Sequence, residues 1–185
     1  ARLLDEIKKH ILRCREQKIP VRVLVIFNIV DYAVEFYEYI KNHLGNEFPS
    51  HQIILLHSRF SDEDKKRKNQ QIDQLREKEY IIIATQVVEA GMDISSNLLI
   101  TQLAPASSLI QRFGRFLRFD EESLGTIIVW YEIDKDGNII EHVYDKKLTE
   151  QTLKYLQEKK DNLNVHIPFD ISNTQRSIGY EHLLN

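Results

Sequence analysis

The sequence has only one cysteine, Cys14, and no long apolar run. A single cysteine excludes a disulfide within the chain and any zinc site built from several cysteines, so we expect Cys14 to be a small apolar residue in a helix. The longest apolar run is far too short to span a membrane, and the first residues do not resemble a signal peptide. We therefore expect an intracellular protein, located in the cytoplasm, with no membrane partner.

Several motifs of nucleotide and metal chemistry are also missing. No glycine is followed by lysine, which excludes the phosphate-binding loop G-x-x-x-x-G-K-[ST], and no D-E-x-D or D-E-x-H string is present to hold a magnesium ion. The seven histidines are scattered and none precedes an aspartate, so we predict no metal site. The net charge is −3, so a nucleic acid could be bound only by a local basic patch.

What the sequence does contain is a regular alternation of β-rich and amphipathic helical segments. Continuous apolar runs of the kind that are buried on both faces of a parallel sheet occupy residues 21–27, 53–57, 80–85, 98–103 and 125–133. Helical periodicity is found at residues 2–17, at 31–44 and from Ser61 onward. This order predicts an α/β fold, a parallel sheet with helices on both faces.

The C-terminal part follows a different pattern. An Asp-Gly turn within residues 134–138 predicts a β-hairpin of 126–133 and 139–144, and a helix over 148–160 follows, with Leu148, Leu153 and Leu156 facing inward. Residues 1–161 are expected to form one lobe. Residues 162–185 are interpreted as a linker or as the start of a further region.

Three arginines lie within seven residues, in the string Gln111-Arg112-Phe113-Gly114-Arg115-Phe116-Leu117-Arg118. The planar guanidinium group presents several donors that suit a phosphate. Arg115 and Arg118 lie three residues apart, so they are expected to share one helical face and to converge on one target. A solvated basic helix is the simpler alternative, but the full pattern Q-R-x-G-R-x-x-R is far more specific than its arginines alone. Phe113 and Phe116 are expected in the core.

A second segment, ATQVVEAGMDIS at residues 84–95, follows an apolar strand at the edge where parallel sheets bind ligands. Gly91 would let the backbone approach a ligand closely, Asp93 can accept hydrogen bonds from ribose hydroxyls, and Thr85 can donate to a backbone phosphate. On its own, this string could equally be a turn capped by an aspartate.

A third segment, LLHSRF at residues 55–60, ends a strand at the same edge and places His57, Ser58 and Arg59 there. The basic run that follows, residues 65–68, is better explained as a solvated helix face, because Glu63–Arg67 and Asp64–Lys68 are well spaced for ion pairs.

Together with LVIFNIV at residues 24–30, these segments resemble motifs IV, IVa, V and VI of superfamily 2 helicases, over about residues 20–132. The chain is most similar to the C-terminal, RecA-like lobe of the helicase of type I CRISPR interference, which often carries a nuclease domain. The sequence departs from the family at Ile29, where threonine is more usual, so no strand contact is expected there.

The resemblance implies an ATP-dependent DNA helicase or translocase, with ATP and Mg²⁺ bound mainly by a first RecA-like lobe. It implies that Arg115 and Arg118 are arginine fingers. The residues implied to contact the nucleotide are Gly91, Asp93, Gln111 and Arg112. Those implied to contact the single strand are His57, Ser58, Arg59 and Thr85. Gln111 and Arg112 would also couple the two lobes. The implied partners are the first lobe, single-stranded DNA, an RNA-guided surveillance complex and a nuclease domain. Two alternatives remain open, the corresponding lobe of a DEAD-box RNA helicase and a non-catalytic nucleic-acid-binding module.

Overall fold

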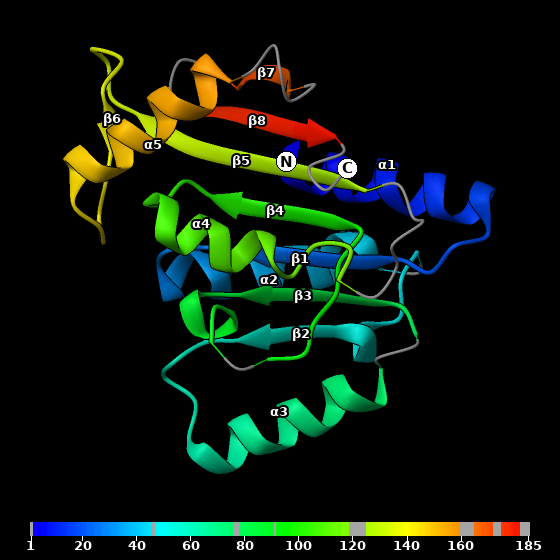
Figure 1. Cartoon of the computed structure of the whole chain (residues 1–185). Helices are drawn as coiled ribbons and strands as arrows, with labels where there is room; N and C mark the ends of the chain where they lie inside the picture. Colours follow the sequence, from blue (N-terminus) through cyan, green and yellow to red (C-terminus); the bar gives the residue numbers. More distant parts are fainter. Residues whose placement is uncertain are drawn as a thin grey trace.

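The computed structural model describes residues 2–45, 47–75, 78–90, 92–118 and 125–159, together with the backbone of residues 165–171 and 175–181. Within these ranges eight strands form one sheet in the order β2-β3-β1-β4-β5-β8-β7, with β6 pairing to β5 (Figure 1). The strands are β1 Arg22–Ile26, β2 Ile53–Leu56, β3 Tyr80–Ala84, β4 Leu98–Gln102, β5 Thr126–Ile133, β6 Ile139–Ile140, β7 Val165–Ile171 and β8 Gln175–Glu181. The first five run parallel, and the last three pair antiparallel.

Helices cover both faces of the sheet, as the sequence predicts. They are α1 Arg2–Gln17, α2 Val30–Leu44, α3 Asp62–Gln74, α4 Ala106–Phe113 and α5 Lys146–Glu158, with short 3₁₀ turns η1 Ser50–Gln52 and η2 Gln86–Val88. Because successive side chains of a strand point to opposite faces, Leu24 and Ile26 enter the core beneath α3, α4 and α5, whereas Val23 and Val25 enter the core beneath α1 and α2. In Figure 1, α4 and α5 lie in front of the sheet and α1 and α2 behind it.

The helix ends follow local rules of the sequence. The Ser61 hydroxyl accepts the N–H of Asp64 and begins α3, and the Asp145 carboxylate accepts the N–H of Leu148 and begins α5. Gly45 ends α2 with a positive φ of 42°. The exception is Ile29, which occupies the N-cap of α2 without any side-chain hydrogen bond.

Two details of the expected core are corrected. Leu148 lies in the first turn of α5, which begins two residues earlier than predicted, and is 52% exposed, while Leu153 and Leu156 are buried. The predicted hairpin forms, but its second strand is only Ile139–Ile140. Cys14 is buried in α1 as expected, and burial raises the pKa of its thiol to about 11. No helix in the described ranges is long and apolar enough to cross a membrane.

Past residue 161, where a linker is predicted, the backbone of β8 pairs antiparallel with β5 and that of β7 pairs with β8. The linker interpretation is therefore wrong for these two segments. The sequence carries a signal for β7, since VHIPFDI has apolar residues at every second position, the period of a strand. Pro168 lies where the register shifts between His166 and Phe169, an irregularity that suits a residue without an N–H.

At the amino-terminal edge of the sheet, Asn97 joins α1 to the sheet. Its Oδ1 lies 2.7 Å from Nε2 of His10 and accepts the N–H of Arg22 at 3.0 Å, and its Nδ2 donates to the Pro20 carbonyl. Because Arg13 can only donate to Nδ1 of His10, the proton of the neutral ring belongs on Nε2. Burial, helped by the nearby charge of Arg13, lowers the pKa of His10 to about 4 despite the bond to Asn97.

Candidate functional site at the carboxyl edge of the sheet

The predicted site residues gather where the parallel strands end. The parallel strands end at one edge of the sheet (Figure 1), where His57 follows β2, Thr85 follows β3 and Arg112 on α4 follows β4, and where Asn28, which is not among the predicted site residues, follows β1. Asn28 is the centre of this edge, because its backbone N–H donates to Gln102 Oε1 at 2.9 Å and its carbonyl accepts from Gln86 Nε2 at 2.9 Å. Its side-chain Nδ2 donates to the carbonyl of Leu103 at 2.8 Å. The ends of β1, β3 and β4 are thereby held together.

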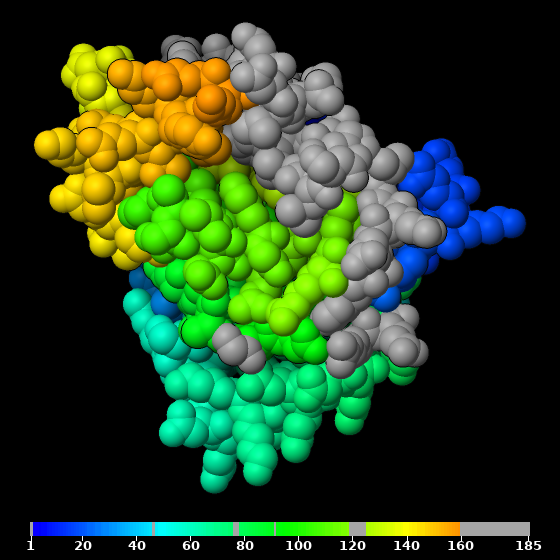
Figure 2. Space-filling view, viewed as in Figure 1, coloured from blue at the N-terminus to red at the C-terminus, as the bar shows by residue number. Residues whose placement is uncertain are grey.

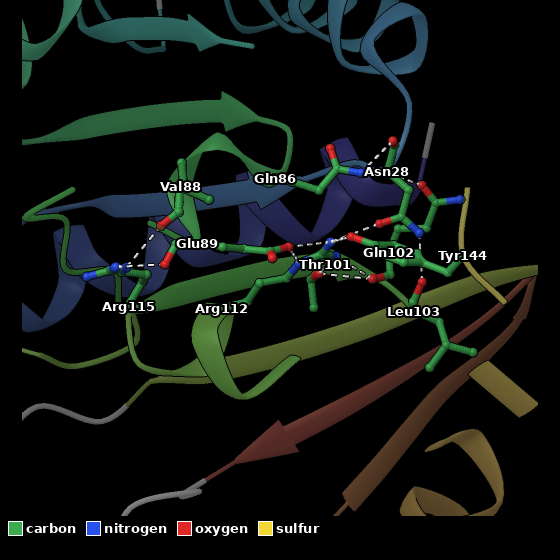
Figure 3. A network of polar contacts seen from close by, with 10 residues as sticks. All are labelled: Asn28, Gln86, Val88, Glu89, Thr101, Gln102, Leu103, Arg112, Arg115 and Tyr144. Atoms are coloured by element: carbon green, nitrogen blue, oxygen red, sulfur yellow. Dashed lines mark hydrogen bonds and ion pairs between the residues drawn. The ribbon is translucent and has the colours of Figure 1, made fainter. Parts of the chain in front are cut away.

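Arg112 points into the lobe and is fully buried, with no exposed surface (Figure 3). Nε donates to Glu89 Oε1 at 2.9 Å, Nη1 to Thr101 Oγ1 and to the Gln102 carbonyl, both at 2.9 Å. Nη2 donates to Asn28 Oδ1 and to Tyr144 Oη, both at 3.0 Å. The five donors of the guanidinium group are thus matched by five acceptors.

This arrangement corrects the nucleotide contact expected of Arg112. A buried side chain whose donors all have partners inside the lobe cannot reach a ligand in a cleft. Arg112 instead ties together the chain segments that carry the other site residues. Its counter-charge is Glu89, whose side chain is 19% exposed. No role is predicted from the sequence for Glu89 or for Tyr144.

Arg115 and Arg118 do not lie on a helix, which corrects the geometry predicted from their spacing. Helix α4 ends at Phe113, with Gly114 at its C-cap, and Leu117 adopts a left-handed conformation with φ 47°. A parallel bridge between Ser96 and Phe116 holds the turn, since the N–H of Ser96 donates to the Arg115 carbonyl and the Ser96 carbonyl accepts from Leu117, each at 2.8 Å.

The ring of Phe116 is buried in the core, as expected, and it packs against Gly125. A Cβ atom at position 125 would lie 2.3 Å from the ring, so only glycine fits there. The ring and the bridge to Ser96 together fix the direction in which the chain leaves α4.

The two arginines still converge on one segment, residues 88–93. Arg115 donates from Nε to the Val88 carbonyl at 3.1 Å and from Nη2 to the Glu89 carbonyl at 3.2 Å (Figure 3). Burial, followed by the charge of Arg118, lowers the pKa of Arg115, and Asp93 opposes this shift. Two cationic groups near each other, one of them partly desolvated, form a surface that favours an anion.

Arg118 is more exposed than Arg115. Its Nη1 lies 3.4 Å from the Met92 carbonyl and 3.6 Å from Asp93 Oδ1, with both side chains more than 40% exposed. Asp93 therefore lies beside Arg118, whereas Gly91 lies outside the described residues. Gln111 is exposed on α4, one residue before the buried Arg112.

Among the predicted strand contacts, Ser58 and Arg59 are exposed, while His57 and Thr85 are buried. Thr85 is only 1% exposed, which argues against the phosphate contact expected of it. Arg59 forms an exposed ion pair with Asp31 at 2.5 Å. His57 stacks on Phe60 with ring centroids 3.9 Å apart, and burial, with Lys68 and Arg59 nearby, lowers the pKa of His57.

The basic run of α3 is mainly a solvated helix face, as predicted, with Lys66 and Arg67 exposed; side chains of α3 project from the surface in Figure 2. Lys65 pairs with Asp62 and Arg67 with Asp64, three rather than four residues apart. Lys68 differs, because its Nζ lies 4.4 Å from the centre of the Phe60 ring. In the described ranges no group of three His, Cys, Asp or Glu residues is placed to hold a metal ion.

The chain matches the family model of the C-terminal part of the CRISPR-associated nuclease/helicase Cas3 over residues 21–121. A CRISPR-associated nuclease/helicase Cas3 of Methanothermobacter thermautotrophicus is 31% identical over 144 residues, which are 73% of this chain and 16% of that protein. The chain thus spans only a small part of that relative.

Two solved structures are also similar. T. fusca Cas3-ATP is 30% identical, with a TM-score of 0.47 over 54% of this chain and 12% of that one. The Mss116p DEAD-box helicase domain 2 bound to an RNA duplex is 17% identical, with a TM-score of 0.53 over 66% of this chain and 46% of that one. The second comparison concerns the fold alone and agrees with a RecA-like arrangement.

Proposed function

Since the chain belongs to the family of CRISPR-associated Cas3 nuclease/helicases, as a C-terminal part of such a protein, we propose that it is the second motor lobe of an ATP-dependent DNA helicase or translocase. One observation carries the proposal: Arg115 and Arg118 converge on residues 88–93 at the carboxyl edge of the sheet, where α/β folds bind ligands.

In this proposal Arg115 and Arg118 act as arginine fingers. ATP with Mg²⁺, bound in the cleft between two lobes, supplies the phosphoryl group whose transfer to water drives the motor. The two contacts of Arg115 use Nε and Nη2 and involve neither proton of Nη1, so that corner of the guanidinium group can stabilise negative charge on a phosphate. Asp93 and Gln111, both exposed, are suited to contact the nucleotide from the same side.

The chain supplies half of such a site. Its sequence has no phosphate-binding loop and no D-E-x-D or D-E-x-H string, so we expect the lobe alone to be inactive until a first RecA-like lobe completes the cleft. Closure of the lobes around the nucleotide and reopening afterwards would alternate the grip on one DNA strand.

We assign Ser58 and Arg59 to that strand, because both are exposed at the end of β2. Phosphate contacts of this kind position a strand without reading its sequence. Single-stranded DNA, a surveillance complex that presents the target and a nuclease domain are the partners that the proposal requires. The family match favours this reading over the DEAD-box alternative.

The test is ATP hydrolysis by this chain with single-stranded DNA, first alone and then mixed with a separately expressed first lobe. Turnover only in the mixture is expected, and turnover by the chain alone would contradict the half-site. In the active mixture, Arg115→Ala should lower kcat on the order of a thousandfold, as expected for an arginine finger, while strand binding measured by fluorescence anisotropy stays close to wild type.

Arg15→Ala is the matched control, because Arg15 is an exposed arginine at the opposite edge of the sheet, paired with Glu79. Its turnover should equal that of the wild type. Turnover retained in Arg115→Ala would remove the arginine-finger assignment and would favour a non-catalytic binding module. Stronger stimulation by RNA than by DNA would favour an RNA helicase.

A further inference from the structure

The connection between β6 and α5, residues 141–145, is held rigidly at both ends. The carboxylate of Glu141 accepts the backbone N–H groups of His142, Val143 and Tyr144 at 2.9, 3.0 and 3.1 Å. Directly after them, Asp145 caps α5 through the N–H of Leu148 at 3.0 Å. Tyr144 therefore lies between a closed turn and a helix N-cap, which restricts where its backbone can move.

This connection reaches the network around Arg112. Tyr144 Oη accepts from Nη2 of Arg112 at 3.0 Å, and its half-buried ring packs against the core beneath α4 and α5 (Figure 3). The neighbouring His142 meets Tyr32 of α2 edge to face, with ring centroids 6.3 Å apart. Tyr144 is the one acceptor of Arg112 that lies beyond residues 21–121, the stretch that matches the family model.

Arg112 in turn controls the position of Arg115 by two routes. Its carbonyl accepts the N–H of Arg115 at 3.0 Å, and its guanidinium group holds the carboxylate of Glu89. The backbone carbonyl of that same Glu89 accepts from Nη2 of Arg115 at 3.2 Å. A chain of direct contacts therefore runs from Tyr144 through Arg112 and Glu89 to Arg115.

Loss of the Tyr144 hydroxyl would leave one donor of a fully buried guanidinium group without an acceptor. The remaining partners of that group are Glu89, Asn28 and the end of β4, and Oε1 of Glu89 already lies 2.9 Å from Nη2, so the Glu89 carboxylate can shift toward the freed donor. Glu89 is the most movable of these, because it is a long side chain with some exposure. A displacement of Glu89 would disturb the carbonyl that orients Arg115.

We propose that Tyr144 is a positioning residue for Arg115, and that the β6–α5 connection thereby sets the rate of ATP hydrolysis by the motor. This inference rests on the proposed function of Arg115. Tyr144 touches no nucleotide; it acts through Arg112 and Glu89. The β6–α5 connection would then contribute to catalysis by the lobe as well as join the sheet to α5.

The test is Tyr144→Phe in the complete helicase, with Tyr155→Phe as the matched control, since Tyr155 loses the same hydroxyl from a 57% exposed position on α5. In Tyr144→Phe the kcat of DNA-stimulated ATP hydrolysis should fall about 3- to 10-fold, the factor that one hydrogen bond accounts for. The KM for ATP and the Kd for single-stranded DNA should stay within about twofold of wild type, since neither ligand is touched. Tyr155→Phe should behave as wild type.

Arg115→Ala, measured in the same series, separates the two hypotheses. If Arg115→Ala retains turnover, the proposed function fails. If Arg115→Ala is inactive while Tyr144→Phe has a wild-type kcat, the proposed function stands and the role of Tyr144 is refuted. A parallel loss of kcat and strand binding in Tyr144→Phe would also refute it, because that pattern belongs to a merely structural residue; a lower unfolding temperature alone would not, since an unpaired buried donor costs stability in either case.

Discussion

The buried position of Arg112 predicts a large loss of stability when its donors are removed. Arg112→Lys keeps the charge, but an ammonium group has three donors where the guanidinium has five, so at least two of the acceptors at Asn28, Glu89, Thr101, Gln102 and Tyr144 lose their partner. At about 1 kcal/mol or more for each unpaired buried group, the loss should be about 2–3 kcal/mol. Arg112→Met also removes the partner of Glu89 and should cost about 3–5 kcal/mol, as expected for breaking a buried ion pair.

Urea unfolding followed by the fluorescence of Trp130, the only tryptophan of the chain and 4% exposed, measures these losses directly. With a slope of about 2 kcal/mol per molar urea, Arg112→Lys should lower the unfolding midpoint by about 1 M. The control is Arg118→Met, which removes an exposed arginine of the same motif and should change stability by less than about 0.5 kcal/mol. If Arg112→Lys and Arg118→Met unfold at the same urea concentration, Arg112 is not buried in a network that satisfies all of its donors.

Two further predictions concern α1 and α2. The folded chain holds the pKa of His10 at about 4, below the ordinary 6.5, so the unfolded chain binds an extra proton at pH values between these two. The free energy of unfolding should therefore be highest above pH 6.5 and fall by up to about 3 kcal/mol as the pH drops toward 4. In His10→Gln the urea unfolding midpoint should therefore depend less on pH than in the wild type. An unchanged dependence on pH would show that His10 does not cause it. Ile29→Thr supplies a hydroxyl at the uncapped N-terminus of α2 and should raise stability by about 1 kcal/mol. Ile29→Val, which has no hydroxyl, should give no such gain in the same thermal or urea unfolding assay.

The sheet and its helices could be predicted because each depends on local signals. The continuous apolar runs marked the parallel strands, and Ser61 and Gly45 marked helix ends through caps that need only neighbouring residues. The turn after α4 could not be predicted in the same way. Leucine gives no sign of the left-handed conformation that Leu117 adopts, and the bridge from Ser96 that holds this turn comes from another part of the chain.

The roles of the three arginines could likewise be predicted only in part from the sequence. Their sequence predicted that this segment carries a cluster of phosphate-binding groups, and Arg115 and Arg118 do converge on residues 88–93. Nothing in the string distinguishes Arg112 from the other two, because its burial depends on acceptors that lie up to 84 residues away in the sequence. One of these, Tyr144, belongs to a region in which no motif was recognised. Tertiary contacts of this kind override what a residue type suggests by itself.

The different ways in which Arg115 and Arg118 are held imply that they respond differently to ionic strength. Arg115 is oriented by the uncharged backbone carbonyls of Val88 and Glu89, whose hydrogen bonds dissolved salt hardly weakens. Arg118 also donates to a backbone carbonyl, that of Met92, but in addition it pairs with the exposed carboxylate of Asp93, and salt weakens exposed ion pairs. Raising the salt concentration therefore weakens one contact of Arg118 but neither of the two carbonyl contacts of Arg115. Two arginines only three positions apart in the sequence thus differ in how much of their bonding depends on the ionic surroundings.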